Sequence, residues 1–147
     1  MLFPSHDQTR RGSNFVTQKV VKTAVEIYLG QACTLTLGNI DSARDWGHSK
    51  DYVRAMHLMM QHDTPDDFVI ATGETRTIRE LVDFVFKELG LSTKGRIKFN
   101  SHYTRPEELD MLKGDASKAR KALNWEPVYS YQDMIREMIN HWKEKLA

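Results

Sequence analysis

The sequence predicts an α/β protein that is rich in helices and has only a few short strands. Apolar residues recur at helical spacing in five segments, and short apolar runs of the strand type separate several of these segments. Capping residues or glycines stand at the expected helix ends. Because helices and strands alternate along much of the chain, we expect at most a small sheet with helices packed against it.

The first third of the chain is predicted to contain the end of a strand, a long helix and a second strand. Residues 1–3 (MLF) are apolar like a strand end, and a polar loop follows them. Residues 13–14 (SN) can cap a helix whose apolar positions fall mostly on one face, and Gly30 ends it. Residues 33–37 (CTLTL) alternate as a strand does. The single cysteine, Cys33, lies in this apolar run, so we expect it to be buried.

The middle of the chain is predicted to add a helix, a buried strand and a second helix. The first helix is expected over residues 49–61, and residues 68–71 (FVIA) are a short apolar strand candidate. Thr77 and Glu80 form a capping box for a helix that ends at Gly90. Three methionines of the 49–61 helix are expected to fill the core: Met56, Met59 and Met60.

The last third is predicted to contain one strand and two helices. Residues 96–99 (RIKF) are the strand, and a long polar loop follows them. A short helix is expected over residues 115–123, and the last helix is expected to start near Ser130 and run towards the C-terminus. Trp125 is expected to pack at the end of the short helix.

Length and composition favour one domain without a strong overall charge. The chain has 147 residues, of which 40% are hydrophobic and 28% charged, and its formal net charge is +1. This balance gives no general attraction to nucleic acid or to an anionic membrane. One cysteine and the histidine spacing provide no metal-site pattern, and no apolar run is long enough to span a membrane. The start, MLFPSHDQTRRG, is not a signal peptide, so we expect a cytoplasmic protein.

Common catalytic and nucleotide-binding motifs are missing from the sequence. There is no G-x-G-x-x-G dinucleotide fingerprint, no phosphate-binding G-x-x-x-x-G-K-[ST], no G-x-S-x-G and no H-E-x-x-H. No tyrosine is followed by a lysine four residues later. The chain therefore holds no self-contained catalytic set that we can identify.

Polar side chains gather instead in three loops near predicted strand ends, where open α/β folds bind ligands. Arginine suits a phosphate because its planar guanidinium donates two parallel hydrogen bonds. Three arginine loops could therefore meet at a pyrophosphate, with Lys19 adding a charge from the first helix. The alternative is ordinary solvated loop charge, or an Arg44 that pairs with Asp45 or a helix end. The loop residues concerned are Arg10 and Arg11, Asn39 and Arg44, and Arg105 and Glu108.

Several of these segments together resemble a known family. They are RRGSNFVTQK, LGNIDSARDWGHSKDYVRAMHLMMQ, DFVIATGE, YTRPEELDMLKGD and KALNWEP. In this order they resemble the C-terminal half of GDP-mannose 4,6-dehydratases, which belong to the extended short-chain dehydrogenase/reductase superfamily. The resemblance runs from about His6 onward. The combination of RRGxNFVTxK with RDWGHxKDYV is its most specific part.

The resemblance implies a Rossmann-type NAD(P)-binding enzyme of which this chain is the C-terminal, substrate-binding part. The family converts GDP-mannose to GDP-4-keto-6-deoxymannose and water, with a tightly held NADP accepting and returning a hydride. The family's catalytic Thr or Ser, Glu and Tyr-x-x-x-Lys lie in an N-terminal half that this sequence lacks. We therefore expect residues 1–147 to form a single substrate-binding domain that is inactive alone.

The resemblance also implies binding roles for individual residues. Two match the family segment that approaches NADP: His6 and Arg11. Two match the helix that faces the nucleotide and the diphosphate: Val16 and Lys19. Three match the strand end that receives the guanine, largely through backbone groups: Leu37, Gly38 and Asn39. Arg44 matches the diphosphate arginine, and Arg105 and Glu108 match the R-P-x-E residues at the nucleotide.

A fragment of this kind implies partners and leaves rival functions open. An apolar edge left by missing strands predicts a homo-oligomer, or a partner chain that supplies the N-terminal half. One rival is a stand-alone or degenerate nucleotide-sugar-binding module without turnover. Another is part of a related sugar-nucleotide epimerase or reductase, since the sugar-facing contacts would lie mostly in the missing half.

Overall fold

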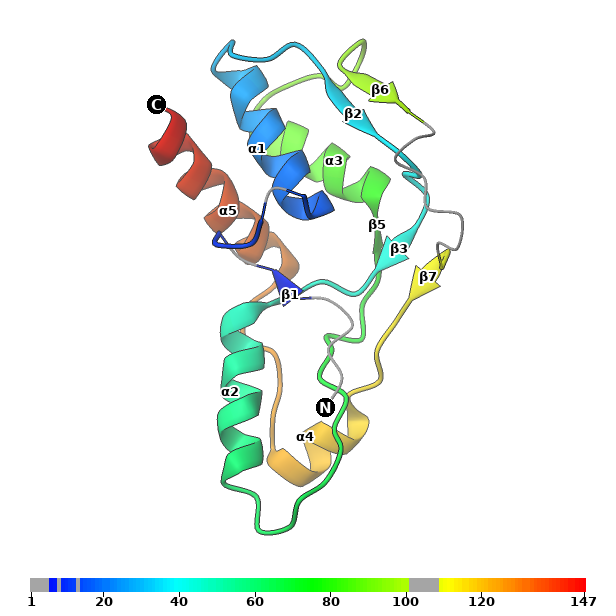
Figure 1. The fold of residues 1–147 in the computed structure, drawn as a ribbon, viewed down its shortest axis with the longest axis vertical. Helices are drawn as coiled ribbons and strands as arrows, with labels where there is room; N and C mark the ends of the chain where they lie inside the picture. The colour runs from blue at the N-terminus through cyan, green and yellow to red at the C-terminus, as the bar shows by residue number, and fades with distance from the viewer. Residues whose placement is uncertain (1–5, 8, 13, 101–108) are drawn as a thin grey trace.

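The structure is a computed structural model and describes residues 6–7, 9–12, 14–100 and 109–147 (Figure 1). Within these ranges it is helix-rich, as predicted, with short strands between the helices. The helices are α1 (Val16–Tyr28), α2 (Ser49–Met60), α3 (Ile78–Glu88), α4 (Ser117–Leu123) and α5 (Tyr131–Leu146). The strands are β1 (His6–Asp7), β2 (Leu35–Leu37), β3 (Ala43–Arg44), β4 (Gly47–His48), β5 (Arg76–Thr77), β6 (Ile97–Phe99) and β7 (Met111–Leu112).

The described strands form three small sheets. β1 pairs with β4 and β2 pairs with β6, both in parallel. In the third sheet β3 lies between β5, which is antiparallel to it, and β7, which is parallel. The strand β3 carries Arg44, so this sheet places Arg44 directly opposite Leu112 of β7.

The first hydrophobic core lies between α1, α3, α5 and the strand β2. Helix α1 contributes a fully buried face that includes Val20, Val21 and Ala24. Helix α5 packs against α1, and the indole of Trp142 donates a 2.7 Å hydrogen bond to Oε1 of Gln18. This buried bond satisfies two polar groups where the helices cross, as interior polar groups require.

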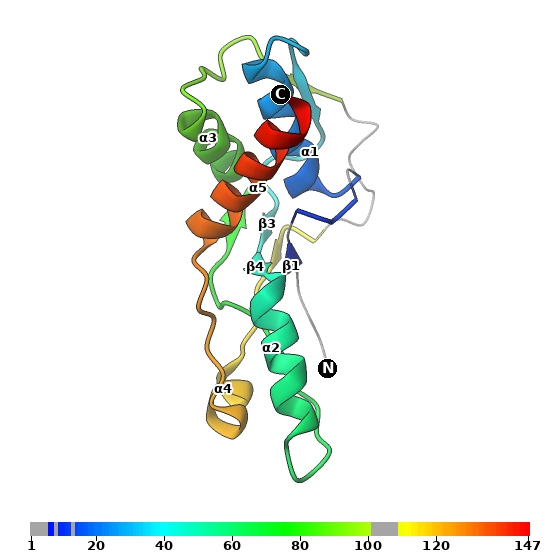
Figure 2. The ribbon, with the colours of Figure 1, turned by 90° about the vertical axis from the view of Figure 1, so that its left-hand side faces the viewer.

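A second core lies at the other end of the elongated molecule (Figure 2), beneath α2 and α4. Its centre is Trp125, which is fully buried and donates from its indole nitrogen to the carbonyl of Asp51 at 2.9 Å. Phe68 and Ile70 fill the space between Trp125 and the inner face of α2. Trp125 is thus the packing residue that the sequence predicts.

Side-chain caps explain where two helices begin. Thr77 accepts a hydrogen bond from the Glu80 backbone, and the Glu80 carboxylate accepts one from the Thr77 backbone, which is the predicted capping box of α3. Ser130 and Asp133 form a second capping box at α5. The predicted helices therefore agree with α1 to α5 within a few residues at each end.

Several details of the sequence prediction are wrong. Residues 68–71 form no strand, because Val69 makes only an isolated bridge and a strand needs a continuous partner. Cys33 is exposed because β2 starts at Leu35, two residues later. Met56 and Met60 are exposed rather than in the core. The prediction for residues 1–3 lies outside the described residues.

Over the ranges that the structure describes, no helix has the length and apolar character needed to cross a bilayer.

Candidate functional site

The loop that carries the predicted guanine and phosphate contacts is held by backbone hydrogen bonds. It leaves β2 after Leu37 and turns at Asn39, whose side-chain oxygen accepts from the backbone N–H of Asp41 at 3.0 Å. The first two N–H groups of α3, at residues 78 and 79, donate to the carbonyls of Ser42 and Ile40. The turn is therefore positioned by the start of α3, and Gly38 lies within it, half-buried.

Arg44 links this loop to a second one. Its Nη1 donates two hydrogen bonds of 2.8 Å, one to the carbonyl of Leu109 and one to the carbonyl of the preceding residue, Ala43. Leu109 is the first described residue after the 101–108 segment, so the Arg44 guanidinium contacts the described end of the chain that follows that segment. Arg105 and Glu108 themselves lie outside the described residues.

Asp45 anchors the loop from beneath. Its fully buried carboxylate accepts from the backbone N–H of Thr72 (3.1 Å), the Thr72 hydroxyl (2.6 Å) and the N–H groups of Gly73 (2.8 Å) and Gly114 (3.4 Å). A buried carboxylate needs such donors, because an unpaired buried charge is costly. Asp45 therefore ties its own strand end to two other chain segments, around residues 72–73 and at residue 114.

The start of α1 provides a second positively charged region. Lys19 is half-buried on the first turns of α1, and this burial lowers the pKa of its ammonium group. The helix starts after Phe15 without a side-chain cap and has no acidic residue in its first turn. The guanidinium of Arg11 lies 3.7 Å from the centre of the Phe15 ring. Two cations therefore lie within the first turns of α1 or the residues just before it, near the positive end of the helix dipole.

The remaining predicted contacts are placed only in part. The side chain of Leu37 is buried in the first core, and its carbonyl accepts from the N–H of Asn100 at 2.9 Å. Val16 packs, half-buried, against the same core. The backbone of His6 pairs with Gly47 in the β1–β4 sheet, and its side chain lies outside what the structure describes.

Two buried residues next to the loop have roles that the sequence did not reveal. The His48 ring accepts from the backbone N–H of Lys50 at 3.1 Å, so its other nitrogen carries the proton and donates to Glu137 at 3.2 Å. Burial favours a higher pKa for Glu137, but hydrogen bonds from Lys50 and His48 outweigh it and lower the pKa. Asp51 accepts from the N–H groups of residues 128 and 129. The only sequence signal for these two residues was their position at the start of the predicted 49–61 helix.

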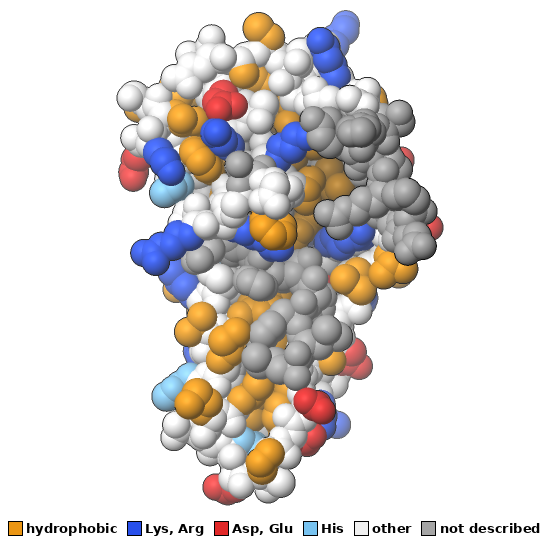
Figure 3. Space-filling view, in the orientation of Figure 1, with side chains coloured by type: hydrophobic (Ala, Val, Ile, Leu, Met, Phe, Trp, Pro, Cys, Tyr) orange, Lys and Arg blue, Asp and Glu red, His pale blue; other side chains and the backbone are white. Residues whose placement is uncertain are grey.

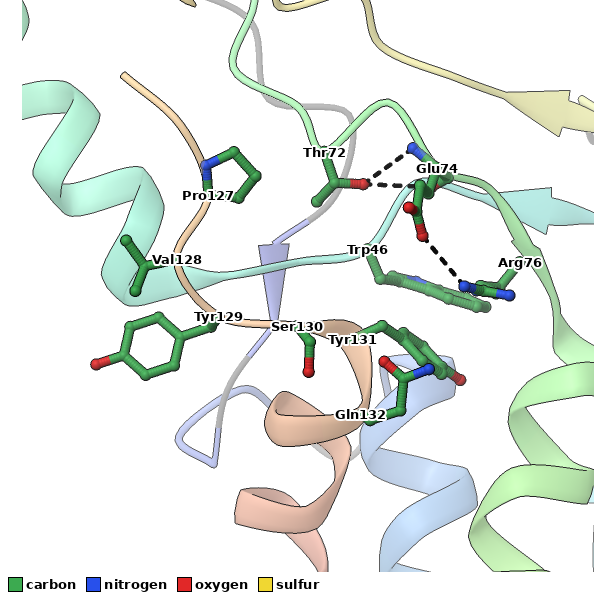
Figure 4. Close-up of a pocket in the computed structure, with 10 residues that line it drawn as sticks. All are labelled: Trp46, Thr72, Glu74, Arg76, Pro127, Val128, Tyr129, Ser130, Tyr131 and Gln132. Atoms are coloured by element: carbon green, nitrogen blue, oxygen red, sulfur yellow. Dashed lines mark hydrogen bonds and ion pairs between the residues drawn. The ribbon is translucent and has the colours of Figure 1, made fainter. Parts of the chain in front are cut away.

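A hollow of about 450 Å³ lies next to these residues, between α5 and the turn after Thr72 (Figure 4). Trp46 and Tyr131 are stacked in it with 6.3 Å between ring centres, and the Arg76 guanidinium lies 5.5 Å from the Tyr131 ring. None of the predicted nucleotide-binding residues whose side chains the structure describes lines it. The lining residues are Trp46, Thr72, Glu74, Arg76, Pro127, Val128, Tyr129, Ser130, Tyr131 and Gln132.

The ionisable side chains of this hollow are neutral or paired. Burial raises the pKa of the Tyr131 hydroxyl, so the group stays neutral and is neither a base nor a nucleophile. Within the described part of the chain, the Tyr131 hydroxyl and the Arg76 Nε are buried without hydrogen-bond partners. The Glu74 carboxylate neutralises Arg76 at 3.1 Å, which weakens any attraction for an anion.

The fold defines the class of protein. The RMD protein of Pseudomonas aeruginosa complexed with NADPH superposes with a TM-score of 0.87 at 20% identity, covering 96% of this chain and 46% of that one. The UDP-glucose 4-epimerase of Thermotoga maritima with UDP-glucose superposes with a TM-score of 0.81 at 20% identity, covering 99% of this chain and 45% of the epimerase chain. The chain thus has the fold of a part of the Rossmann-type extended short-chain dehydrogenase/reductases, as the sequence predicts.

Sequence comparison identifies the family within this class. The profile of the GDP-mannose 4,6 dehydratases matches residues 1–138, and the chain belongs to that family. The GDP-mannose 4,6 dehydratase of Cricetulus griseus is 43% identical over 152 residues, which cover 92% of this chain and 41% of the relative. The chain therefore spans about two fifths of the length of the curated relatives that it matches.

Proposed function

We propose that this chain is the sugar-nucleotide-binding portion of a GDP-mannose 4,6-dehydratase and that residues 1–147 form one substrate-binding domain. In the whole enzyme, GDP-mannose would lose water to give GDP-4-keto-6-deoxymannose, with NADP carrying the hydride. Membership of the family supports the reaction. The lack of a dinucleotide fingerprint and of a Tyr-x-x-x-Lys pair supports inactivity of the chain alone.

The observation that carries the proposal is the contact between Arg44 and Leu109. The Arg44 guanidinium of β3 donates to the carbonyl of residue 109, and this supports the proposal that Arg105 and Glu108, which precede it in sequence, contribute to the same site. Strands β3 and β7 are parallel there, so loops next to both strands share one edge of the sheet. This supports a diphosphate bound by separate loops, which suits the bidentate donors of arginine.

Lys19 and Arg11 extend the same proposal. A lysine ammonium that is partly removed from water gains more from a neighbouring phosphate than an exposed one, because the effective dielectric constant is lower. We propose that Lys19 contacts the diphosphate, and that Val16, Leu37, Gly38 and Asn39 border the nucleotide. We propose that His6 and Arg11 contact NADP in the whole enzyme. The cytoplasmic location is part of the proposal.

Calorimetric titration of the chain with GDP and GDP-mannose tests this function. We expect Lys19→Met to weaken binding roughly tenfold or more, because a hydrogen bond to a charged group contributes about 1.5–3 kcal/mol. Lys94→Met is the matched control, since Lys94 is exposed on the turn after α3 and should leave binding unchanged.

Arg44 needs a gentler substitution because its guanidinium also donates to carbonyl groups. Arg44→Lys keeps the charge but loses bidentate geometry, so binding should weaken while the circular dichroism spectrum stays the same. Arg136→Lys is its control, because Arg136 is exposed and paired with Glu88, away from the loop, and its exchange should leave binding unchanged. Absence of binding to both ligands would contradict a retained site and favour the degenerate module.

A related epimerase or reductase is the second candidate. The likeness to the UDP-glucose 4-epimerase structure supports it at the level of fold alone. Titration with UDP-glucose separates the two, since equal binding of UDP-glucose and GDP-mannose would contradict guanine recognition.

A further inference from the structure

The hollow between α5 and the turn after Thr72 has the size and lining of a small-molecule site (Figure 4). Its volume of about 450 Å³ lies within the range of roughly 300–1,000 Å³ that is typical of ligand pockets. Such pockets combine apolar and aromatic side chains with a few polar groups. The apolar and aromatic lining residues here include Trp46, Pro127, Val128 and Tyr131. The proposed function assigns no role to this hollow.

The aromatic wall of the hollow can hold a flat ring. Trp46 and Tyr131 are stacked with 26° between their planes, and their ring centres are 6.3 Å apart. This separation is near the long end of the range for aromatic pairs, so the two rings do not cover each other fully. A ligand ring that lies against this wall gains both apolar burial and aromatic contact.

The polar groups at this wall lack a hydrogen-bond acceptor. The Tyr131 hydroxyl and the Nε of Arg76 are buried without partners in the described part of the chain. Both groups donate, because a guanidinium nitrogen has no acceptor capacity and burial raises the pKa of the Tyr131 hydroxyl, which keeps it protonated. A buried donor without an acceptor is costly, so an oxygen atom placed at this wall would stabilise the molecule.

The described lining of the hollow has no net charge. Among the described lining residues, Glu74 and Arg76 are the only acidic and basic ones, and their side chains form an ion pair at 3.1 Å. By contrast, Lys and Arg side chains gather around the middle of the face shown in Figure 3. An anion in the hollow would lie near the Glu74 carboxylate and a cation near the Arg76 guanidinium. A neutral ligand therefore suits the hollow better than either, because juxtaposed like charges are costly.

We propose that this hollow binds a small neutral molecule that has a flat aromatic ring and a carbonyl oxygen. The ring lies against Trp46 and Tyr131, and the carbonyl oxygen accepts from the Tyr131 hydroxyl, with the Arg76 Nε as a second donor. A carbonyl only accepts, so it satisfies these donors without bringing unpaired donors of its own. This site is separate from the proposed nucleotide site, because no predicted nucleotide-binding residue with a described side chain lines it.

A sugar ring is the less suitable ligand. Each of its hydroxyl groups brings a donor as well as an acceptor, and the unpaired groups of the hollow are donors. The apolar side chains of Pro127 and Val128, of which Val128 is 68% exposed, offer those hydroxyls no partner. An aromatic ring covers the same side chains without burying polar groups, which is costly when they stay unpaired.

Proton–nitrogen correlation spectra of the chain test the proposal, with acetanilide as the probe. Trp46 lines the hollow, whereas the indoles of Trp125 and Trp142 donate to acceptors elsewhere. We expect acetanilide to shift the Trp46 indole signal with a Kd of about 1 mM, typical of a small fragment. The other two indole signals should stay in place, and exchange of each tryptophan for phenylalanine assigns the three signals.

Tyr131→Phe tests the hydrogen bond directly. It keeps the ring but removes the unpaired hydroxyl, so the Kd for acetanilide should rise roughly threefold or more. Tyr28→Phe is the matched control, because Tyr28 is 49% exposed at the end of α1, away from the residues that line the hollow, and the Kd should stay the same. Circular dichroism shows whether each variant is folded.

Three results would overturn the proposal. They are a Trp46 signal that does not move up to about 10 mM acetanilide, equal shifts of all three indole signals, and an unchanged Kd in the folded Tyr131→Phe variant. Tighter binding of benzoate, benzylammonium or glucose than of acetanilide would overturn it as well. Such a result would assign the hollow to an anion, a cation or a sugar.

Discussion

Arg44 and Asp45 are adjacent in sequence but serve different purposes. Arg44 points its guanidinium at carbonyl groups at the edge of the β3–β7 pair, where a ligand could replace or add to them. Asp45 points inward and is saturated by donors from two other segments. The pairing of Arg44 with Asp45, one alternative left open by the sequence, would compete with these donors.

We predict that Asp45→Ala lowers the free energy of unfolding by about 3 kcal/mol or more, because it leaves buried N–H groups without an acceptor. Urea unfolding followed by circular dichroism measures this. Asp63→Ala is the control, since Asp63 is exposed and its loss should cost less than about 0.5 kcal/mol. Equal stability of Asp45→Ala and wild type would show that the anchor is dispensable.

At the scale of single elements, the capping box of α3 predicts a dependence of stability on pH. The backbone and hydroxyl of Thr77 donate to Glu80 and lower the pKa of this carboxyl below its ordinary value of 4.5. A lowered pKa in the folded state contributes stability that is present above the unfolded pKa and is lost as pH falls through the folded pKa.

We therefore expect the melting temperature of the wild type to fall, relative to Glu80→Gln, as pH decreases from about 5 to 3. The difference should be a few degrees, because Glu80 is largely exposed and solvent screens its interactions. Glu126→Gln, at an exposed glutamate outside any capping box, should follow the wild-type profile. Parallel profiles for wild type and Glu80→Gln would show that the Glu80 carboxylate is not the source of the pH dependence.

The helices were predictable because their signals are local. The spacing of apolar residues and the T-I-R-E box lie within the helices that they define, and α3 starts where that box places it. The strands were less predictable, since a strand exists only if a partner lies beside it. Residues 68–71 are apolar enough for a strand, but only Val69 finds a bridge in this chain.

The family motifs predicted which residues belong to the candidate site. They did not predict the buried side chains that hold its loop in place. The sequence identified Arg44, and the structure places it next to Leu109. It did not identify Asp45 or Asp51, because their donors are backbone groups of residues 27 to 78 positions away. Long-range backbone donors leave no pattern in a single sequence. The prediction for Met56 and Met60 was wrong because residue type alone does not say which face of α2 turns to the core, and both side chains are exposed.

At the scale of the whole molecule, partly buried hydrogen bonds connect the regions around the two hydrophobic cores. Asp51 holds the segment that leads from Trp125 to α5, and His48 holds Glu137 of α5. We therefore predict that both cores unfold together, since neither end can open without breaking these bonds.

Tryptophan fluorescence tests this cooperativity. Trp46→Phe/Trp142→Phe leaves Trp125 as a reporter of the second core, and Trp46→Phe/Trp125→Phe leaves Trp142 for the first. In each variant the urea midpoint by fluorescence should coincide with that by far-ultraviolet circular dichroism. Midpoints that differ between the reporter and the circular dichroism would mean that the two ends melt independently.

The hydrogen bonds of Asp45 also limit which substitutions can be accepted at this position during evolution. Three of its four hydrogen bonds come from main-chain amides, which exist whatever side chains occupy those positions, proline apart. No exchange at residues 72, 73 or 114, other than to proline, removes the demand for an acceptor. A descendant that loses this aspartate must therefore rebuild the path of its chain or recruit a trapped solvent molecule, so we expect the position to tolerate fewer replacements than its arginine neighbour.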